Sequence, residues 1–497
     1  MLHHHSRHAW RTCSRVRLRS LSHRMAAGLK PPQYYVPDFP KDGRIEFISD
    51  VEGNWDYFCS LIARSSVLQW TDDGTAGGSL ALTPNGYVVF GGDAPDKGPG
   101  DLRIVRLLVL LQRANPERVF LLVGNRDSNK LRLAAELADG EIHDKDPVSY
   151  LDSVSWEGRK QQLADFLSEN GLQRTQFNAL RWTLEKTMGA RMAIQNRRSE
   201  LQVLGKPSTD ADILRSFRDL VDPQAAEPWQ LWYLQAAQVM VVIGDCLFVH
   251  GALRSRGLLL VPAEDCRDGK SEGQPPPLRL PESTTLEEWA AELNQWKARQ
   301  LRWFEAFPRF VHDGDSRWRG GMPLMMPSLV GCRVMIDGFL QGGNCAALEP
   351  DVAEYLSRHG IRRIFTGHQP VGQSPAVMRT GDIVVMAVDT SFSNPQAAAT
   401  SANPADCRGC AVSTVTIEAK STQVSGILSD GTEHGFCLPL DEEACPDAMY
   451  IGHSFADGSW GRTMVDGQVQ TCRGEGFNLL YDLLSPSQAA AQLRHAE

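Results

Sequence analysis

Short apolar runs, each followed by polar residues, recur along the first 130 residues of the chain. They read RIEFIS at 44–49, YVVFG at 87–91 and RVFLLV at 118–123. Runs of this length that are rich in Val, Ile and Phe predict buried strands. Residues 101–114 carry Leu, Ile and Val at helical spacing between the last two runs, and predict a helix. This β-α-β order predicts an α/β fold with helices flanking a sheet.

The middle of the chain changes to a helical pattern. Residues 150–240 lack strand alternation and are rich in Leu, Gln, Arg, Glu and Ala, which predicts a helical insertion of two to four helices that ends at 229–240. Strand signals return at 241–243 and 246–249, around a Gly-Asp pair typical of a hairpin turn. Residues 262–285 include three consecutive prolines and predict a surface loop, and 285–307 predict a helix.

The last third of the chain is less informative. Residues 334–336, 364–366 and 383–388 predict three buried strands. Residues 391–497 mix Gly, Cys and acidic residues without an interpretable motif, so we expect a C-terminal extension of unknown role.

Composition restricts the class of protein. Of the 497 residues, 42% are hydrophobic and 22% are charged, which is typical of a globular chain and excludes a disordered one. No apolar run approaches the roughly 18 residues that span a bilayer, so we expect a soluble protein without membrane contacts. The eleven cysteines have unrelated spacings, which favours reduced thiols and a cytoplasmic location.

Charge is unevenly distributed. Residues 1–37 hold seven Lys or Arg and no acidic residue, which is typical of a disordered basic tail or of a mitochondrial or plastid presequence. The rest of the chain has 44 basic and 60 acidic residues, which gives it a net charge of −16. An acidic main body disfavours nonspecific nucleic-acid binding, because such binding requires a basic face.

Five polar clusters follow the strand-like runs. They read DVEGN at 50–54, GDAPDKG at 92–98, GNRD at 124–127, HG at 250–251 and GHQP at 367–370. Any one of them alone would indicate only a turn or a core histidine. Five in order indicate one site, because loops after the strands of an α/β sheet gather at one edge.

The donor atoms in these clusters suit metal ions. Two divalent cations about 3.5–4 Å apart need a bridging carboxylate with oxygen and imidazole donors on either side. The clusters contain six such residues: Asp50, Glu52, Asp93, Asn125, His250 and His368. A hydroxide that bridges such a pair can attack phosphorus while the cations neutralise the phosphoryl oxygens.

This ordered set resembles the metallophosphoesterase, or calcineurin-like, superfamily. The resemblance covers residues 44–140 and 241–390, and 87–127 is its most specific part. It implies a domain at 44–390, with the insertion at 150–240 and the loop at 262–285. The implied fold is a pair of packed mixed β-sheets flanked by helices, with a dimetal site at the strand ends.

The resemblance also implies the ligands of each metal. The first ion would be held by Asp50, Glu52 and Asp93, and Asp93 would bridge to the second. The second ion would be held by Asp93, Asn125, His250 and His368. Glu52 replaces a histidine of the family pattern, which makes the first site more anionic and favours Mn²⁺ or Mg²⁺ over Fe or Zn.

Arg126 stands where the family has its catalytic histidine. Because arginine keeps its proton, Arg126 can stabilise charge but cannot protonate a leaving group, which points to phosphoanhydride substrates. A similar Asn-Arg-Asp motif occurs in the bacterial UDP-diacylglucosamine pyrophosphohydrolases of the superfamily. Lys97 matches the family's phosphate-binding arginine, and Asp96 either pairs with Arg126 or only closes a turn.

Within the superfamily, the motifs look closer to diadenosine-tetraphosphatase-like members of the phosphoprotein-phosphatase branch. The expected activity is therefore metal-dependent hydrolysis of a phosphorylated small molecule or nucleotide-like substrate. Two alternatives are a protein Ser/Thr phosphatase and an inactive, phosphatase-like binding module. The insertion at 150–240 can serve as a lid or a protein-partner surface.

Overall fold

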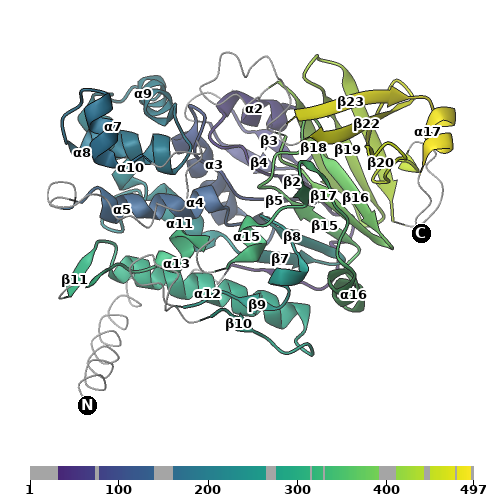
Figure 1. Ribbon diagram of the computed structural model, residues 1–497, viewed down its shortest axis with the longest axis horizontal. Helices are drawn as coiled ribbons and strands as arrows, with labels where there is room; N and C mark the ends of the chain where they lie inside the picture. Colours follow the sequence, from purple (N-terminus) through teal and green to yellow (C-terminus); the bar gives the residue numbers. More distant parts are fainter. Residues whose placement is uncertain are drawn as a thin grey trace.

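Two mixed β-sheets and the helices that cover them make up the computed structural model (Figure 1). It describes residues 32–72, 78–138, 141, 161–264, 276–313, 316–327, 331–390, 410–440, 448–475 and 478–493. One sheet has nine strands in the order β23-β22-β21-β20-β19-β18-β2-β5-β6, and the other has six in the order β1-β7-β8-β15-β17-β16. The predicted α/β class, with two packed mixed sheets flanked by helices, is confirmed.

Parallel strands form one end of the nine-stranded sheet and the interior of the six-stranded sheet. β2 runs parallel to β5, and β5 to β6, while β18 is antiparallel to β2. In the other sheet β15 is parallel to both β8 and β17. The strands of the nine-stranded sheet are β2 (Arg44–Ile48), β5 (Gly86–Phe90), β6 (Val119–Leu121), β18 (Val412–Ile417), β19 (Ser421–Ile427), β20 (Glu433–Pro439), β21 (Trp460–Val465), β22 (Gln468–Glu475) and β23 (Asn478–Leu484).

The six-stranded sheet includes the expected hairpin. β7 and β8 pair in antiparallel fashion around Gly244, whose φ of 56° suits a tight turn. Its strands are β1 (Tyr35–Val36), β7 (Met240–Ile243), β8 (Cys246–Val249), β15 (Arg363–Thr366), β16 (Ala376–Thr380) and β17 (Ile383–Ala387). Short two-stranded pairs complete the set: β3 (Leu68–Trp70) with β4 (Leu80–Leu82), β9 (Leu260–Val261) with β10 (Leu278–Arg279), β11 (Val311–Asp313) with β12 (Ser316–Trp318), and β13 (Leu340–Gln341) with β14 (Asn344–Cys345).

Side-chain alternation explains how the sheets pack. In β5, Val89 joins the core between the two sheets, whereas Val88 and Phe90 join the core beneath the helices. Phe47 of one sheet lies 5.8 Å from Phe248 of the other, measured between ring centroids. Because these strands are buried on both faces, they appear in the sequence as nearly continuous apolar runs.

Helices cover the outer faces around the parallel strands, whereas β19 alternates buried and exposed positions. The predicted helix at 101–114 is α3 (Asp101–Ala114), and the one at 285–307 is α12 (Leu286–Ala306), which begins with a capping box between Thr285 and Glu288. The other helices outside the insertion are α2 (Trp55–Arg64), α4 (Asn125–Asn129), η1 (Lys130–Arg132), α5 (Leu133–Glu136), η4 (Ser255–Gly257), α13 (Met322–Met325), α15 (Arg333–Ile336), α16 (Pro350–Arg358) and α17 (Pro486–Gln492). In the described segments, every helix is too short or too polar to cross a bilayer.

The insertion is helical but contains more helices than predicted. Its described part has five α-helices and one π-helical turn, grouped beside the sheets in Figure 1. They are α7 (Leu163–Glu169), α8 (Gln176–Trp182), η3 (Thr183–Thr187, π-helical), α9 (Ala193–Val203), α10 (Asp210–Asp219) and α11 (Trp229–Ala236). The last ends at Ala236 and not at 240, because Gln238 forms a parallel bridge with Leu122 beyond the end of β6.

Two other segments differ from the sequence prediction. The run at 334–336 lies in α15 and is not a strand, because three apolar residues fit either a buried strand or one buried helical turn. Residues 410–493 supply β18 to β23, so the nine-stranded sheet continues past residue 390 (Figure 1). β18 lies directly beside β2 in the interior of that sheet.

Candidate metal centre

The five polar clusters lie at adjacent strand ends. Asp50 and Glu52 follow β2, Asp93 follows β5 and Asn125 begins α4 just after β6. In the second sheet, His250 follows β8 and His368 follows β15. The topology therefore brings together side chains that are up to 318 residues apart in sequence, as the hydrogen bond from His368 N–H to Asp50 shows.

Left-handed backbone conformations mark these turns. Asp50, Glu52, Asp93 and His368 have φ between 46° and 69°, and Asp96 has a φ of 149°. Residues other than glycine adopt such angles rarely and at a cost of about 1–3 kcal/mol each. Strain of this kind persists where the surrounding structure holds the residue in place, and it is concentrated at functional sites.

Two glycines allow the loops to approach closely. A Cβ on Gly124 would clash with Asp93 Oδ1, and a Cβ on Gly367 would clash with Asp50 Oδ2. Neither contact is tolerable, so only glycine fits at these positions.

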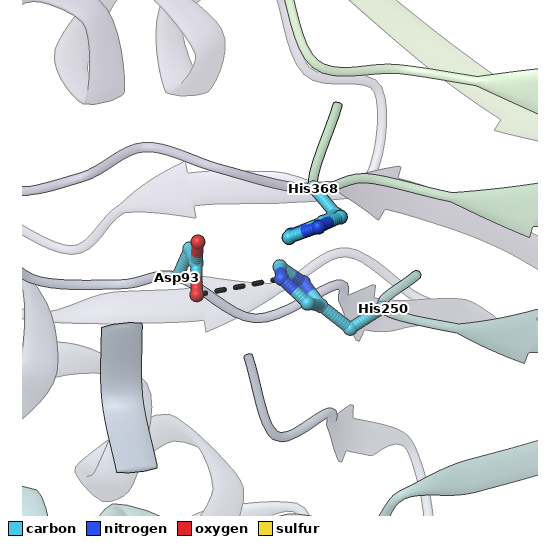
Figure 2. A group of neighbouring side chains, drawn as sticks. All are labelled: Asp93, His250 and His368. Carbon is cyan, nitrogen blue, oxygen red and sulfur yellow. Dashed lines mark ion pairs between the residues drawn. The ribbon is translucent and has the colours of Figure 1, made fainter. Parts of the chain in front are cut away.

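Asp93, Asn125, His250 and His368 form one donor group, which we call the histidine group. His250 Nε2 lies 3.4 Å from Asp93 Oδ1 and 3.1 Å from Asn125 Oδ1. His368 Nδ1 lies 2.8 Å from the same Asn125 oxygen. Figure 2 shows the Asp93 carboxylate and the two imidazole rings directed toward one another.

Backbone carbonyls fix the tautomer of each histidine. His250 Nδ1 lies 2.8 Å from the carbonyl oxygen of Gly91, and His368 Nε2 lies 3.1 Å from that of Ile336. A carbonyl can only accept, so each of these nitrogens carries the proton and the other ring nitrogen presents a lone pair. Burial, and then the neighbouring His250 and Arg126, lower the pKa of His368 to about 3, which keeps its ring neutral.

The histidine group fits a metal ion. Four electron-pair donors converge here: the two imidazole nitrogens, the Asn125 carbonyl oxygen and Asp93 Oδ1. The protons of both imidazole rings lie on the opposite ring nitrogens, which contact backbone carbonyls. Converging lone pairs repel one another unless a cation lies among them. Neutral imidazole, carboxylate and amide oxygen together suit a divalent transition metal.

Asp50, Glu52 and Asp93 form a second group, the carboxylate group. Their ligand atoms lie within 4.8 Å of one another, and all three side chains are buried. The Asp50 carboxylate accepts the backbone N–H of His368 at 3.0 and 2.9 Å and the hydroxyl of Ser49 at 2.5 Å. The two groups share Asp93, as the resemblance implies for a bridging ligand.

Arg126 and Lys97 reach into the carboxylate group. Arg126 Nε lies 2.8 Å from Glu52 Oε1 and 3.6 Å from Asp93 Oδ2, and Lys97 Nζ lies 2.8 Å from Glu52 Oε2. Arg126 Nη1 also forms an ion pair with Asp96, so Asp96 does more than close a turn.

Two residues were missing from the predicted site. Lys130 is buried and pairs with the second oxygen of Asp96, so that Asp96 lies between two cations. Asp127 accepts the N–H groups of Asp93 and Gly124 at 2.8 Å and of Ala94 at 3.1 Å, and thereby holds the Asp93 loop. Burial, and then the charge of Asp93, raise the pKa of Asp127 to about 7. Asp127 belongs to a motif noted above, whereas no pattern marked Lys130.

The helical insertion contacts this site directly. The Met188 carbonyl, just after the π-helical turn, accepts a hydrogen bond from Arg126 Nη1 at 3.2 Å. In α9, the Asn196 side chain donates to the Lys97 carbonyl, and Glu200 accepts the N–H groups of Leu102 and Arg103 at the start of α3. The insertion therefore helps to position the segments that carry Arg126 and Lys97.

No family model and no curated protein matches the chain. Several solved structures match at low identity. A cold-active protein-tyrosine phosphatase of a psychrophilic Shewanella species is 14% identical, with a TM-score of 0.36 over 82% of each chain. A protein serine/threonine phosphatase from Saccharomyces cerevisiae is 12% identical, with a TM-score of 0.33 over 95% of this chain and 87% of its own.

A metallophosphoesterase from Sphaerobacter thermophilus is also similar, at 9% identity and a TM-score of 0.27 over 81% of this chain and 89% of its own.

Proposed function

We propose that this protein is a metal-dependent phosphohydrolase that cleaves phosphoanhydride bonds in a nucleotide-like or pyrophosphate substrate. The observation that carries the proposal is the convergence of four donors in the histidine group, with Arg126 and Lys97 a few ångströms away. A divalent cation beside fixed positive side chains suits phosphoryl transfer, in which negative charge spreads over the phosphoryl oxygens.

The metal would be held by Asp93, Asn125, His250 and His368. When bound, a divalent ion supplies the Lewis acidity that activates water and neutralises phosphoryl charge. Two imidazoles beside two oxygens suit a divalent transition metal such as Mn²⁺, Fe²⁺ or Zn²⁺, whereas the expectation of Mn²⁺ or Mg²⁺ rests on Glu52 in the carboxylate group. A second ion in the carboxylate group is the expectation that the resemblance adds.

The charged side chains indicate the leaving group. Arg126 is positioned by Asp96 and by the Met188 carbonyl, and it keeps its proton, so it binds and stabilises oxygen charge without donating a proton. Burial raises the pKa of Asp127 to about 7, but this carboxyl lies behind Asp93 and its oxygens accept backbone N–H groups. A phosphate or nucleotide leaves without protonation far more readily than an alkoxide does, which favours anhydride substrates.

A second candidate is a phosphatase-like binding module. Arg126, Lys97 and Lys130 already balance much of the carboxylate charge, so the loops are stabilised without turnover. Such a module would bind a phosphorylated partner at the same cations and would hydrolyse nothing.

The test is a comparison of substrates across metals. Metal-stripped protein is supplied with Mn²⁺, Mg²⁺, Fe²⁺ or Zn²⁺ and assayed on bis(p-nitrophenyl) phosphate, p-nitrophenyl phosphate, a dinucleoside polyphosphate and a phosphopeptide. We expect metal-dependent turnover that is fastest on the polyphosphate and falls more than about 100-fold in Asp93→Asn and His368→Asn.

Fastest turnover on the phosphopeptide would instead indicate a protein phosphatase. Absence of turnover with metal bound, together with retained binding of a nonhydrolysable polyphosphate, would indicate the binding module. Gln202→Ala, on the exposed side of α9, is the control for general effects of substitution.

A further inference from the structure

We infer that the site binds one divalent metal ion per chain, in the histidine group, and that the guanidinium of Arg126 takes the place of a second ion in the carboxylate group. This inference rests on the proposed function, since it concerns the metal content of the same site. It departs from the two-ion centre that the sequence resemblance implies.

The first observation is the position of Arg126. Its Nε lies between two of the three carboxylates of the group, 2.8 Å from Glu52 Oε1 and 3.6 Å from Asp93 Oδ2. Its backbone N–H donates to the other oxygen of Asp93 at 2.8 Å. A metal ligated by Glu52 and Asp93 would need the space and the oxygen atoms that this guanidinium now uses.

The second observation is the charge on Glu52. One of its oxygens contacts Arg126 and the other contacts Lys97 Nζ at 2.8 Å, so each oxygen already has a cation. Glu52 is also the residue that departs from the histidine of the family pattern. A carboxylate here satisfies a guanidinium and an ammonium, which a neutral imidazole could not do.

The third observation is that Arg126 is held from behind. Nη1 pairs with Asp96 and donates to the Met188 carbonyl at 3.2 Å, and Asp96 is itself fixed by Lys130. Arg126 cannot lose its proton to make room. A divalent ion in the carboxylate group would therefore lie beside a fixed positive charge, which would repel it.

The histidine group shows the opposite pattern. Its donors present lone pairs toward one another, and the ring protons of His250 and His368 are directed to backbone carbonyls. Charge and hydrogen bonding therefore favour a metal in one group and an arginine in the other. Asp93 then contacts both cations, the metal ion in the histidine group and the Arg126 guanidinium in the carboxylate group.

The test counts metal ions in the full-length protein. Chelator-stripped protein is dialysed against excess Mn²⁺, and bound manganese is measured by mass spectrometry and by electron paramagnetic resonance of frozen solution. We expect one ion per chain with the six-line spectrum of an isolated Mn²⁺. Glu52→Gln should still bind one ion, whereas His368→Ala should bind none.

Arg126→His should restore the second site. It removes the guanidinium, supplies an imidazole, and should bind two ions with the broadened spectrum of a coupled pair. Arg126→Met is the companion variant if the histidine variant fails to fold, and circular dichroism reports folding of each. We expect the second ion to bind at least tenfold more tightly in these variants than in the parent.

The outcomes separate this inference from the proposed function. Two ions in the parent, reduced to one by Glu52→Gln, would overturn the inference and leave the phosphohydrolase intact. No bound ion in the folded parent would overturn both. One ion in the parent whose binding is abolished by Glu52→Gln and unaffected by His368→Ala would place the metal in the wrong group and would also overturn the inference.

Discussion

Asp96 combines burial, two ion pairs and an unusual backbone angle. Its carboxylate is 1% exposed and forms ion pairs with both Arg126 and Lys130. Its backbone N–H donates to Asp101 at 2.9 Å, and its φ of 149° is unusual for a residue with a side chain. A buried carboxylate between two cations is stable only while all three charges are present.

Substitution of Asp96 should therefore destabilise the fold. We expect Asp96→Asn to lower the free energy of unfolding by about 3 kcal/mol, because two buried cations lose their shared anion. Adding Lys130→Met removes one of those cations, so the double variant should be more stable than the sum of the two single effects by at least about 1 kcal/mol. Urea unfolding of the parent and three variants measures this, and strict additivity would contradict the role given to Lys130.

For single residues, the sequence predicted that the six expected ligands lie close together, but it did not predict the orientation of the neighbouring charged side chains. The six expected ligands come together because each follows a strand end, and strand ends are visible as breaks in apolar runs. Where the Arg126 guanidinium lies depends on Asp96, Glu52 and the Met188 carbonyl, which come from three separate segments. No local pattern encodes that arrangement.

Among the elements, β2 carries the most unusual side chain. Glu46 is fully buried in this interior strand, with one carboxylate oxygen accepting the Ser65 hydroxyl at 2.6 Å. The other oxygen, Oε1, has no hydrogen-bond partner within the described part of the chain. Burial raises the pKa of Glu46 from 4.5 to about 7, although the Ser65 hydrogen bond opposes the shift.

This shift predicts a pH dependence of stability. The folded protein holds the Glu46 proton more tightly than the unfolded chain, so the contribution is fully present below pH 4.5 and is lost as the pH rises to about 7. We expect the free energy of unfolding of the parent to fall by about 2 kcal/mol more than that of Glu46→Gln between pH 5 and pH 8. Urea midpoints at the two pH values measure this. Glu282→Gln, at an exposed position, should keep the parent slope.

The elements that the sequence missed share a physical cause. The segment at 334–336 is too short for periodicity to separate a strand from a helical turn. Strands such as β19 alternate buried and exposed positions but use Ser, Thr, Gln and Gly, so their apolar signal is weak. By contrast, α3 and α12 were predicted within one residue because they are long and periodic.

For the molecule as a whole, the strands after residue 410 complete the core. Val415 and Ile417 of β18 and Val424 of β19 are buried between the two sheets, in the same cluster as Phe47 and Phe248. β18 also supplies the second neighbour of β2, the strand that leads to Asp50 and Glu52. The segment expected to be an extension is structurally part of the fold.

Removal of this segment should prevent folding. A chain that ends at residue 390 would expose the edge of β2 and the apolar face between the sheets, so we expect aggregation or strong binding of a hydrophobic dye. Size-exclusion chromatography and dye fluorescence against the full-length protein measure this. A monomeric fragment with cooperative unfolding would show instead that the segment is dispensable.

The pairing of β18 with β2 also joins two strands that are synthesised at very different times. Phe47 leaves the ribosome 368 residues before its partner Val415, and at about 5–20 residues per second this interval lasts on the order of tens of seconds. During that interval β2 has a neighbour on only one side, and the apolar face that will lie between the sheets is incomplete. The nascent chain therefore carries Asp50 and Glu52 for most of that interval before His368 and β18 are synthesised, so the metal site can be completed only near the end of translation.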